Sequence, residues 1–434
     1  MSKSASRTPS RPSEDDGVLG TQVELEISNV AHGGVFVARH EGRVVFVPDV
    51  LPGERVRARI SEVRHDSFWR ADALEVLESS PHRVAHVWAE ASIDRRPEDR
   101  VGGAEFGHAA LAHQRELKRT VLEDAFARFA RQEVSVEVSP IEGDDETRGL
   151  GWRTRNRLHV DDDGRVGPYA SRSHHVVTVD TLPLATAASA AAAPLDGRLA
   201  PGSVVDLVDA AGSEGAAVLV HDPSDKKARR DRTVVTEFVA DRTFRVDRSG
   251  FWQVHRGAAA TLFDAVQTAV DPERSDPRAA NHDLYGGVGL LAAALADRLG
   301  AGLRVTSVES DARATEHALE NLSDQVGARA VTARVDRYLR DALAQADARE
   351  RERWRSATVV LDPPRSGAGR AVTDALVELA PAQLVYVACD PVALARDVGA
   401  LAAGGYELER LDGFDLFPNT SHVEAVARLV RRSA

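Results

Sequence analysis

Short apolar runs alternate with helical segments from about residue 246 to the end of the chain, and this alternation constrains the fold most strongly. Strands that are separated by helices form a parallel sheet with helices on both faces. We therefore predict an α/β domain over residues 246–434, built on a doubly wound, Rossmann-like sheet with a terminal antiparallel hairpin. The predicted strands are Val305–Val308, Ala330–Val335, Thr358–Leu361 and Leu384–Ala388, followed by Tyr406–Leu411 and Val423–Val430 in the hairpin.

Residues 20–80 have a different pattern, in which short alternating stretches are separated by turns. Leu25 and Ile27 alternate with polar neighbours, and Gly33-Gly34 and Pro52-Gly53 interrupt the strands. Several short strands with turn signals predict a small β-barrel of the oligonucleotide-binding type.

Two features of this predicted barrel have both a structural and a nucleic-acid interpretation. Arg55, Arg57 and Arg59 share one face of a strand, which is either solvated or directed toward RNA. Phe68 and Trp69 either stack on bases or close the barrel, and we favour closure.

The remaining segments are patterned less clearly. Residues 1–19 are polar and lack the apolar segment of a secretory signal, so we expect a disordered tail. Residues 81–245 predict a central α+β region with a helix over Ala110–Arg131 and a second, Ala-rich helix. Strands are expected over Trp152–Val160 and Val176–Val179.

Composition excludes several classes of protein. A chain of 434 residues is expected to form two or three domains. Its single cysteine excludes a disulfide framework and any metal or iron–sulfur site that is built on several thiolates. No apolar run is long enough to span a bilayer, so we expect no membrane partner and a cytoplasmic location. The formal net charge of −12 argues against a general nucleic-acid coat protein but leaves room for a local basic groove.

The segment Asp283–Gly289, DLYGGVG, follows a short strand and precedes an Ala- and Leu-rich helix. Glycines at this point let a ligand approach the backbone closely. Glu309 ends the next strand, twenty residues after Gly289, where a carboxylate can accept both ribose hydroxyls of an adenosine cofactor. This geometry serves NAD and S-adenosylmethionine (SAM) enzymes alike, and an ordinary tight turn is the structural alternative. Asp336, after the third strand, either meets the adenine or caps a helix.

Two further segments end predicted strands, and a third candidate residue lies within one. Asp362-Pro363-Pro364-Arg365 ends the fourth strand, and arginine in place of an aromatic residue points away from amine methylation. Cys389 ends the fifth strand, where Asp390 disfavours its thiolate and the following helix favours it. Glu424 lies in the apolar last strand, where burial would raise its pKa and suit it to act as a base. The structural alternatives are a core cysteine and a salt-bridged glutamate.

Together these segments resemble the RNA uracil-5-methyltransferase family, whose members form 5-methyluridine in tRNA or ribosomal RNA. The similarity covers residues 20–80 and 250–434, and the N-terminal barrel resembles the RNA-binding TRAM domain of that family. The resemblance implies SAM as the methyl donor and tRNA or ribosomal RNA as the partner of an enzyme that we expect to be a monomer. The segments that carry it are VACDPVALARD, LDPPRSG, DLYGGVG, the terminal HVE and Gly250–Gln253.

The resemblance also implies roles for individual residues. Cys389 would add to carbon 6 of uracil, and Glu424 would remove the proton from carbon 5 after methylation. Phe251 would stack on the flipped-out uracil, or it packs in the core as the structural alternative. The implied cofactor-binding residues are Gln253, Tyr285, Glu309, Asp336 and Asp362.

The central region resembles the family more weakly. Its candidate phosphate-binding residues, from an Arg-rich strand and a Ser–His segment, are Arg153, Arg155, Arg157 and His174. A basic cluster could also bind phosphate or form an exposed loop; it consists of Lys226, Lys227, Arg229, Arg230 and Arg232. Many relatives carry four cysteines for an iron–sulfur cluster where this chain has Val101–Ala104, so we expect no cluster and transfer no substrate identity from cluster-containing members.

Three other functions remain open from the sequence. A SAM enzyme acting on an amine or a small molecule is disfavoured by Arg365 and by the pair Cys389 and Glu424. A non-catalytic RNA-binding or assembly factor is disfavoured because both of these reactive residues are present. A nicotinamide-dependent dehydrogenase fits the glycines and Glu309, but no residue pattern supplies its hydride chemistry.

Overall fold

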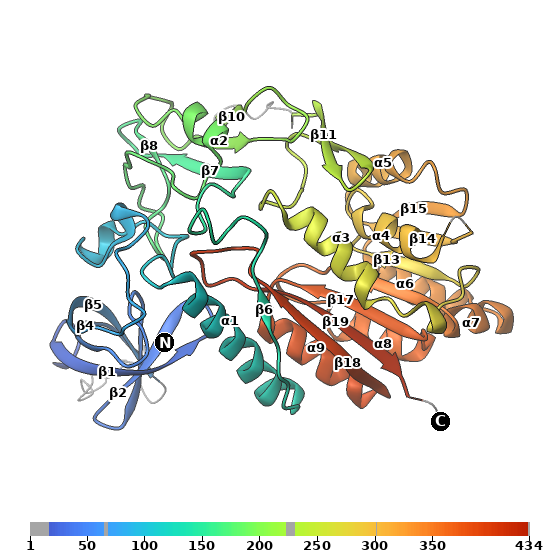
Figure 1. Cartoon of the computed structure of the whole chain (residues 1–434), viewed down its shortest axis with the longest axis horizontal. Coiled ribbons are helices and arrows are strands. Elements are labelled where there is room, and N and C mark those ends of the chain that lie inside the picture. Colours follow the sequence, from blue (N-terminus) through green and yellow to red (C-terminus); the bar gives the residue numbers. More distant parts are fainter. Residues whose placement is uncertain (1–16, 65–67, 223–230, 301, 433–434) are drawn as a thin grey trace, which may run out of the picture.

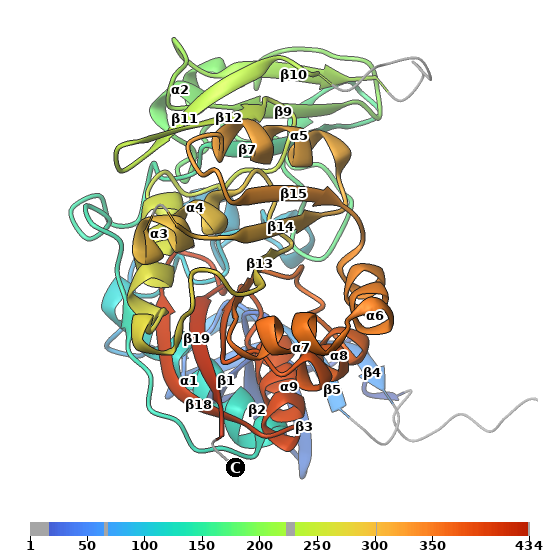
Figure 2. The ribbon, with the colours of Figure 1, turned by 90° about the vertical axis from the view of Figure 1, so that its right-hand side faces the viewer.

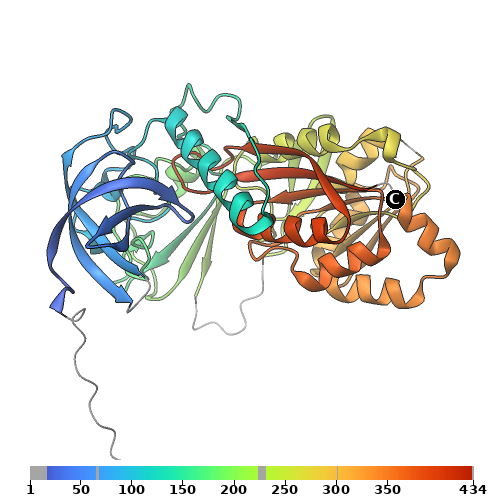
Figure 3. The same cartoon turned by 90° about the horizontal axis from the view of Figure 1, so that it is seen from below.

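The computed structural model describes residues 17–64, 68–222, 231–300 and 302–432. A barrel, a central region and a large α/β domain follow one another along the chain (Figure 1). The barrel and the α/β domain lie at opposite ends of the molecule, and helix α1 (Leu111–Ala125) lies between them (Figures 1 and 3). Most of the tail that was predicted over residues 1–19 lies outside the described residues.

Five strands close the N-terminal barrel in the order β1-β2-β3-β5-β4, which confirms the predicted barrel. Alternate side chains such as Leu25 and Ile27 point inward and are buried. Trp69 is also buried and closes the barrel, whereas Phe68 lies outside, edge-on to Phe46 with ring centroids 5.2 Å apart. The strands are β1 (Gln22–Ala31), β2 (Val35–His40), β3 (Arg43–Val47), β4 (Arg55–Arg64) and β5 (Phe68–Glu78).

The three arginines of β4 form a ladder of ion pairs on the outer face of the barrel. Arg55, Arg57 and Arg59 pair in turn with carboxylates on β5, namely Glu78, Glu75 and Asp72. Exposed pairs of this kind contribute about 0–1 kcal/mol each. Because their charges are compensated within the barrel, the structure favours the solvated interpretation of this face.

The central region contains a small sheet, a two-stranded ribbon and two helices. The four-stranded sheet has the order β10-β9-β7-β8, and the ribbon β11–β12 packs against helix α5 (Ala312–Asn321) of the α/β domain (Figure 2). The strands are β6 (Val138–Ser139), β7 (Arg155–Val160), β8 (Val166–Gly167), β9 (Val204–Val208), β10 (Ala217–His221), β11 (Val234–Val239) and β12 (Arg242–Asp247), and the second helix is α2 (Ala187–Ala192).

Two predictions for the central region were wrong in part. Helix α1 ends at Ala125 and continues as a π-helical turn over Phe126–Ala130, before Arg131 adopts a left-handed conformation with φ of 55°. The predicted strand Val176–Val179 is an irregular segment with a single bridge from Val176 to Tyr169. Val177 and Val179 are buried in the core of the central region, so the β-branched run reflects core packing and not a strand.

The α/β domain is built on an eight-stranded sheet in the order β15-β14-β13-β16-β17-β19-β18-β6. The strands from β15 to β17 are parallel, and β19 runs antiparallel to both β17 and β18, which confirms the predicted doubly wound sheet and its terminal hairpin. The short strand β6 extends the sheet beyond β18, so the hairpin does not form the outer edge. The strands are β13 (Asn281–Leu284), β14 (Val305–Glu309), β15 (Ala328–Thr332), β16 (Thr358–Leu361), β17 (Gln383–Ala388), β18 (Tyr406–Phe414) and β19 (Glu424–Arg431).

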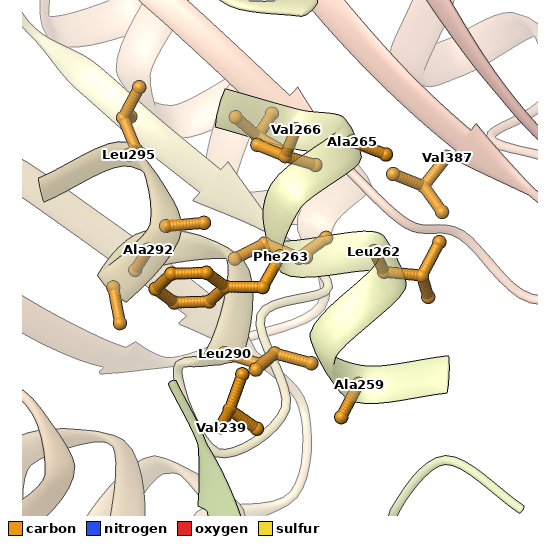
Figure 4. Packing of buried hydrophobic residues seen from close by; sticks show 14 of the residues in the cluster. Val239, Ala259, Leu262, Phe263, Ala265, Val266, Leu290, Ala292, Leu295 and Val387 are labelled. Atoms are coloured by element: carbon orange, nitrogen blue, oxygen red, sulfur yellow. The ribbon is translucent and has the colours of Figure 1, made fainter. Parts of the chain in front are cut away.

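Helices cover both faces of this sheet. Along β16, Val359 faces one layer of helices and Val360 faces the other, because successive side chains of a strand point to opposite faces. Phe263 of α3 packs against α4 and Val239 in the layer that Val360 faces (Figure 4). That layer holds α3 (Ala258–Ala269), α4 (Leu290–Leu299) and α5, and the opposite layer holds α6 (Val335–Gln345), α7 (Ala348–Arg355), α8 (Arg370–Leu379) and α9 (Pro391–Ala403).

The predicted strand Ala330–Val335 was placed too late in the chain. Strand β15 ends at Thr332, and Val335 already begins α6. Val335 and Leu339 lie four residues apart on the buried side of that helix, so the apolar pattern continues across the strand–helix junction. In the described parts of the chain, no helix is long and apolar enough to cross a membrane.

Candidate active site

A cleft of about 1450 Å³ lies at the carboxyl ends of the parallel strands. Ligands of open α/β sheets bind at this edge, where the strand order reverses, and here the reversal falls between β13 and β16. The cleft brings together nine of the twelve residues that were predicted as functional. These are Arg153, Phe251, Gln253, Tyr285, Glu309, Asp336, Asp362, Cys389 and Glu424.

The glycine turn after β13 forms one wall of the cleft. A Cβ atom at Gly286 would lie 2.0 Å from Oγ of Ser307 on β14, so only glycine lets the turn pack this closely. Tyr285 and Gly287 both have positive φ angles, of 64° and 52°. A Cβ atom at Gly287 would meet no atom within 4 Å, so the backbone there is open to a ligand.

Glu309 is held at the end of β14 beside this turn. Its Oε2 accepts a hydrogen bond from the backbone N–H of Gly287 at 3.2 Å. Its Oε1 accepts from Oγ of Ser310 at 2.9 Å and from the N–H of Asp311 at 2.8 Å. A fixed carboxylate next to an open glycine turn fits the ribose of SAM, so the residues present suit this cofactor.

Asp336 lines the cleft from a different position than the sequence predicted. It lies in the first turn of α6, not at a strand end, and the residue that precedes the helix is Arg334. The guanidinium of Arg334 pairs with Asp336 at 3.1 Å, and this contact lowers the pKa of the carboxyl. Asp336 is therefore an ionised carboxylate that lines the cleft, and it does not cap the helix.

Cys389 and Glu424 meet at the other end of the cleft. Ala388 of β17 pairs with Ala425 of β19 in an antiparallel register. Cys389, which follows Ala388, therefore lies beside Glu424, which precedes Ala425. Cys389 is partly buried, and Glu424 is 4% exposed. The pair therefore places the single thiol of the chain beside a buried carboxyl.

The protonation of this pair is set by burial and by neighbouring charges. Burial raises the pKa of Cys389 to about 12, the negative charges of Glu424 and Asp362 add to the rise, and the guanidinium of Arg365 opposes it. Burial, with a further contribution from Asp362, raises the pKa of Glu424 well above its usual value, and Arg365 again opposes the rise. The free cleft consequently holds a neutral thiol, and Arg365 is the cation that favours its ionisation.

Phe251 projects into the cleft from the loop after β12. Phe251 is 74% exposed, which contradicts simple core packing and leaves the ring free to stack on a ligand. The loop is fixed from behind by Arg155, whose Nη1 donates to the carbonyl oxygens of Arg248 at 2.8 Å and Gly250 at 3.0 Å. Arg155 thus stabilises the loop that carries Phe251 and does not itself line the cleft.

The other central candidates have separate surroundings. Arg153 lines the cleft, and its Nε donates to the carbonyl of Arg155 at 3.0 Å. Arg157 forms an exposed ion pair with Asp206, and His174 lies edge-on to Tyr169 on the surface. Neither Arg157 nor His174 lines the cleft. Of the basic cluster, Arg232 lines the cleft, and Lys226, Lys227, Arg229 and Arg230 lie outside the described residues.

Arg365, His422 and Glu105 are among the cleft residues that were not predicted as site residues. Arg365 and His422 belong to the segments LDPPRSG and HVE that carried the resemblance, so their motifs could have indicated them. Burial, followed by the charge of Arg365, lowers the pKa of His422 to about 4, so this imidazole is neutral. Glu105 follows Val101–Ala104 directly, and no local pattern places it beside β17 and β19.

The fold and the cleft define a SAM-dependent methyltransferase joined to a small closed β-barrel. A family model described as tRNA (uracil-5-)-methyltransferase matches residues 252–432, and a TRAM domain model matches residues 18–74. An RNA methyltransferase of Streptomyces coelicolor is 38% identical, with 96% of this chain and 94% of the relative covered. A 23S rRNA (uracil(1939)-C(5))-methyltransferase of Chromohalobacter salexigens is 31% identical, with 94% and 89% covered.

The chain therefore belongs to the RNA uracil-5-methyltransferase family, and it is a SAM-dependent RNA methyltransferase. A solved structure supports the fold over nearly the whole length. The Pyrococcus abyssi tRNA (uracil-54, C5)-methyltransferase in complex with S-adenosyl-L-homocysteine is similar with a TM-score of 0.67 and 22% identity. The similarity covers 94% of this chain and 99% of that one.

Proposed function

We propose that this enzyme methylates carbon 5 of a uridine in tRNA or ribosomal RNA, with Cys389 as the nucleophile and Glu424 as the base. One observation carries the proposal. The register between β17 and β19 places a thiol beside a buried carboxyl, in the same cleft as the glycine turn and Glu309. A nucleophile next to a base is the arrangement that covalent catalysis requires.

Carbon 5 of uracil is too weak a nucleophile to be methylated unaided. Cys389 first loses its thiol proton to water, with Arg365 favouring the thiolate. The thiolate then adds to carbon 6, and the electron pair of the C5–C6 double bond moves toward carbon 5 and O4 as an enolate. SAM would supply an electrophilic methyl group to carbon 5 and would leave as S-adenosylhomocysteine when its sulfur–methyl bond breaks. The carboxylate of Glu424 then removes the proton from carbon 5, the double bond forms again, and the thiolate leaves carbon 6.

Other cleft residues bind and orient the reactants. Phe251 stacks on a uracil that has left its own helix, since its exposed ring offers a free face. Arg153 and Arg365 bring positive charge to the end of the cleft where the enolate forms. The cofactor is held by the residues at the glycine turn and the opposite wall, namely Gln253, Tyr285, Glu309, Asp336 and Asp362.

The 31% identity to a 23S rRNA methyltransferase makes ribosomal RNA the first substrate to test, and tRNA the second. Mapping 5-methyluridine in RNA from a deletion strain identifies the modified position. We further propose that the enzyme acts as a monomer in the cytoplasm, which light scattering and cell fractionation test.

RNA that contains 5-fluorouridine tests the covalent step. Fluorine at carbon 5 cannot leave as a proton, so the enzyme incubated with this RNA and SAM should form a stable adduct that survives a denaturing gel. The adduct should be absent in Cys389→Ala. Absence of an adduct in the unmodified protein, with both tRNA and ribosomal RNA as substrates, would falsify the proposed mechanism.

Glu424→Gln tests the base independently with ordinary RNA. Addition and methylation should still occur, but loss of the carbon-5 proton should be slow, so the variant should accumulate a covalent adduct. Rapid turnover in Glu424→Gln would remove this residue from the mechanism.

A further inference from the structure

The turn between β1 and β2 of the barrel reaches the active-site end of the α/β domain. Nε2 of His32, at the start of this turn, donates a hydrogen bond to Oδ2 of Asp390 at 2.9 Å. A Cβ atom at Gly34 would lie 2.9 Å from Cβ of Ser421 and 3.1 Å from Cβ of Glu105. The turn therefore touches three segments that are far apart in the sequence.

Each of these segments carries a residue of the cleft. Asp390 directly follows Cys389, and its other oxygen, Oδ1, accepts the N–H of Ala393 at 2.8 Å and so caps helix α9. Both oxygens of this carboxylate are thus engaged, one by the helix and one by the barrel. Ser421 lies three residues before Glu424, and Glu105 itself lines the cleft. The barrel turn thus contacts the residue that follows Cys389 and a residue three positions before Glu424.

The contact is too exposed to serve mainly as a stabilising ion pair. The side chain of His32 is 48% exposed and that of Asp390 is 22% exposed, and exposed pairs contribute little to stability. The position of the contact suggests its role, because the hydrogen bond from His32 holds Asp390, the residue next to Cys389. The hydrogen bond with Asp390 raises the pKa of His32, which favours the charged donor in this contact.

We propose that His32 is a positioning residue for the methyl transfer, and that the barrel completes the active site by holding Asp390, and through it Cys389, in register with Glu424. The inference rests on the proposed function, since it assigns the role through Cys389. It differs from an RNA-binding role for the barrel, because it acts on the rate of the covalent step and not on the affinity for RNA.

The test measures formation of the 5-fluorouridine adduct in the full-length protein with SAM and saturating RNA, together with the dissociation constant for RNA. His32→Ala should slow adduct formation about tenfold, because a small misplacement of a nucleophile is costly, while the dissociation constant stays unchanged. His32→Gln, which keeps an N–H donor, should restore most of the rate. His40→Ala removes a barrel imidazole that contacts Trp69 instead, and it should behave like the unmodified protein.

Asp390→Ser shows whether His32 acts through Asp390. Serine still caps α9 but cannot reach the imidazole, so adding His32→Ala to this variant should have no further effect on the rate. A further tenfold loss in the double variant would overturn the proposal, as would an unchanged adduct rate in His32→Ala. Failure of the unmodified protein to form any adduct refutes the proposed mechanism instead, so the two failures are distinguishable.

Discussion

Nζ of Lys118 on α1 donates a hydrogen bond to Oδ1 of Asp415, and the two side chains are 0% and 2% exposed. The same ammonium group donates to the carbonyl of Phe417 at 2.9 Å. These contacts tie the helix between the domains to the loop that leads from β18 to Glu424. Burial lowers the pKa of Lys118, and the charge of Asp415 opposes that shift.

Lys118→Met should destabilise the protein by about 3–5 kcal/mol, because Asp415 would remain as an unpaired buried carboxylate. Adding Asp415→Asn should recover part of the loss, since the remaining group is then neutral. Urea unfolding at neutral pH measures both effects. The matched control is Arg119→Met, which removes an exposed cation from the same helix and should change stability little. Equal unfolding free energies for the two single variants would contradict a structural role of the pair.

The thiol of Cys389 should react slowly with iodoacetamide at neutral pH, because its pKa is raised to about 12 from an ordinary 9.0. Glu424→Gln removes a negative charge that destabilises the thiolate, so the pH profile of alkylation should move to lower pH. The experiment is direct because the chain has one cysteine. The unfolded protein gives the reference profile near the ordinary pKa, and a folded protein with that same profile would contradict the raised pKa.

Arg365 should favour the thiolate. Its positive charge opposes the rise in the pKa of Cys389, so Arg365→Ala should move the alkylation profile to higher pH and slow adduct formation with 5-fluorouridine RNA. Arg365→Lys keeps the charge and is the matched control for the alkylation profile. A profile that moves equally in both variants would point to altered packing and away from charge.

Arg155 and Arg157 should differ although they lie on the same strand. Arg155→Lys loses the two hydrogen bonds to the loop that carries Phe251 and should lower kcat/KM about tenfold. Arg157→Ala should leave kcat/KM unchanged, because this side chain pairs with Asp206 away from the cleft. Steady-state kinetics with the RNA substrate compare the two. If Arg157→Ala lowers kcat/KM as much as Arg155→Lys does, Arg155 does not act by supporting the loop that carries Phe251.

The sequence placed Cys389 near the glycine turn because parallel strands bring their carboxyl ends to one edge of the sheet. Glu424 reaches the same edge because it begins β19, which runs antiparallel to β17. Thr358–Leu361 was predicted with its observed bounds, since Asp362-Pro363 ends the apolar run sharply. Asp336 was misplaced because the apolar pattern runs unbroken from β15 into α6.

Contacts between segments that are far apart in the chain could not be predicted from the sequence. Arg153, Arg155 and Arg157 alternate along one segment, yet the first lines the cleft, the second supports a loop more than ninety residues later, and the third pairs on the surface. His32 lies in a glycine-rich turn that looks like any hairpin connection. Only the packing of the barrel against the α/β domain places it beside Asp390.

The buried carboxyl of Asp283 should make stability depend on pH. Burial raises its pKa from 3.8 to about 7, so between these values the folded protein keeps a proton that the unfolded chain has lost. The free energy of unfolding therefore falls as pH rises through this interval. Asp283→Asn cannot ionise but can still accept the N–H of Ala292, so its melting temperature should rise relative to the unmodified protein between pH 5 and pH 8. Asp374→Asn, on the exposed face of α8, is the control and should show no such trend. Parallel melting curves for Asp283→Asn and the unmodified protein across this range would show that Asp283 does not titrate on unfolding.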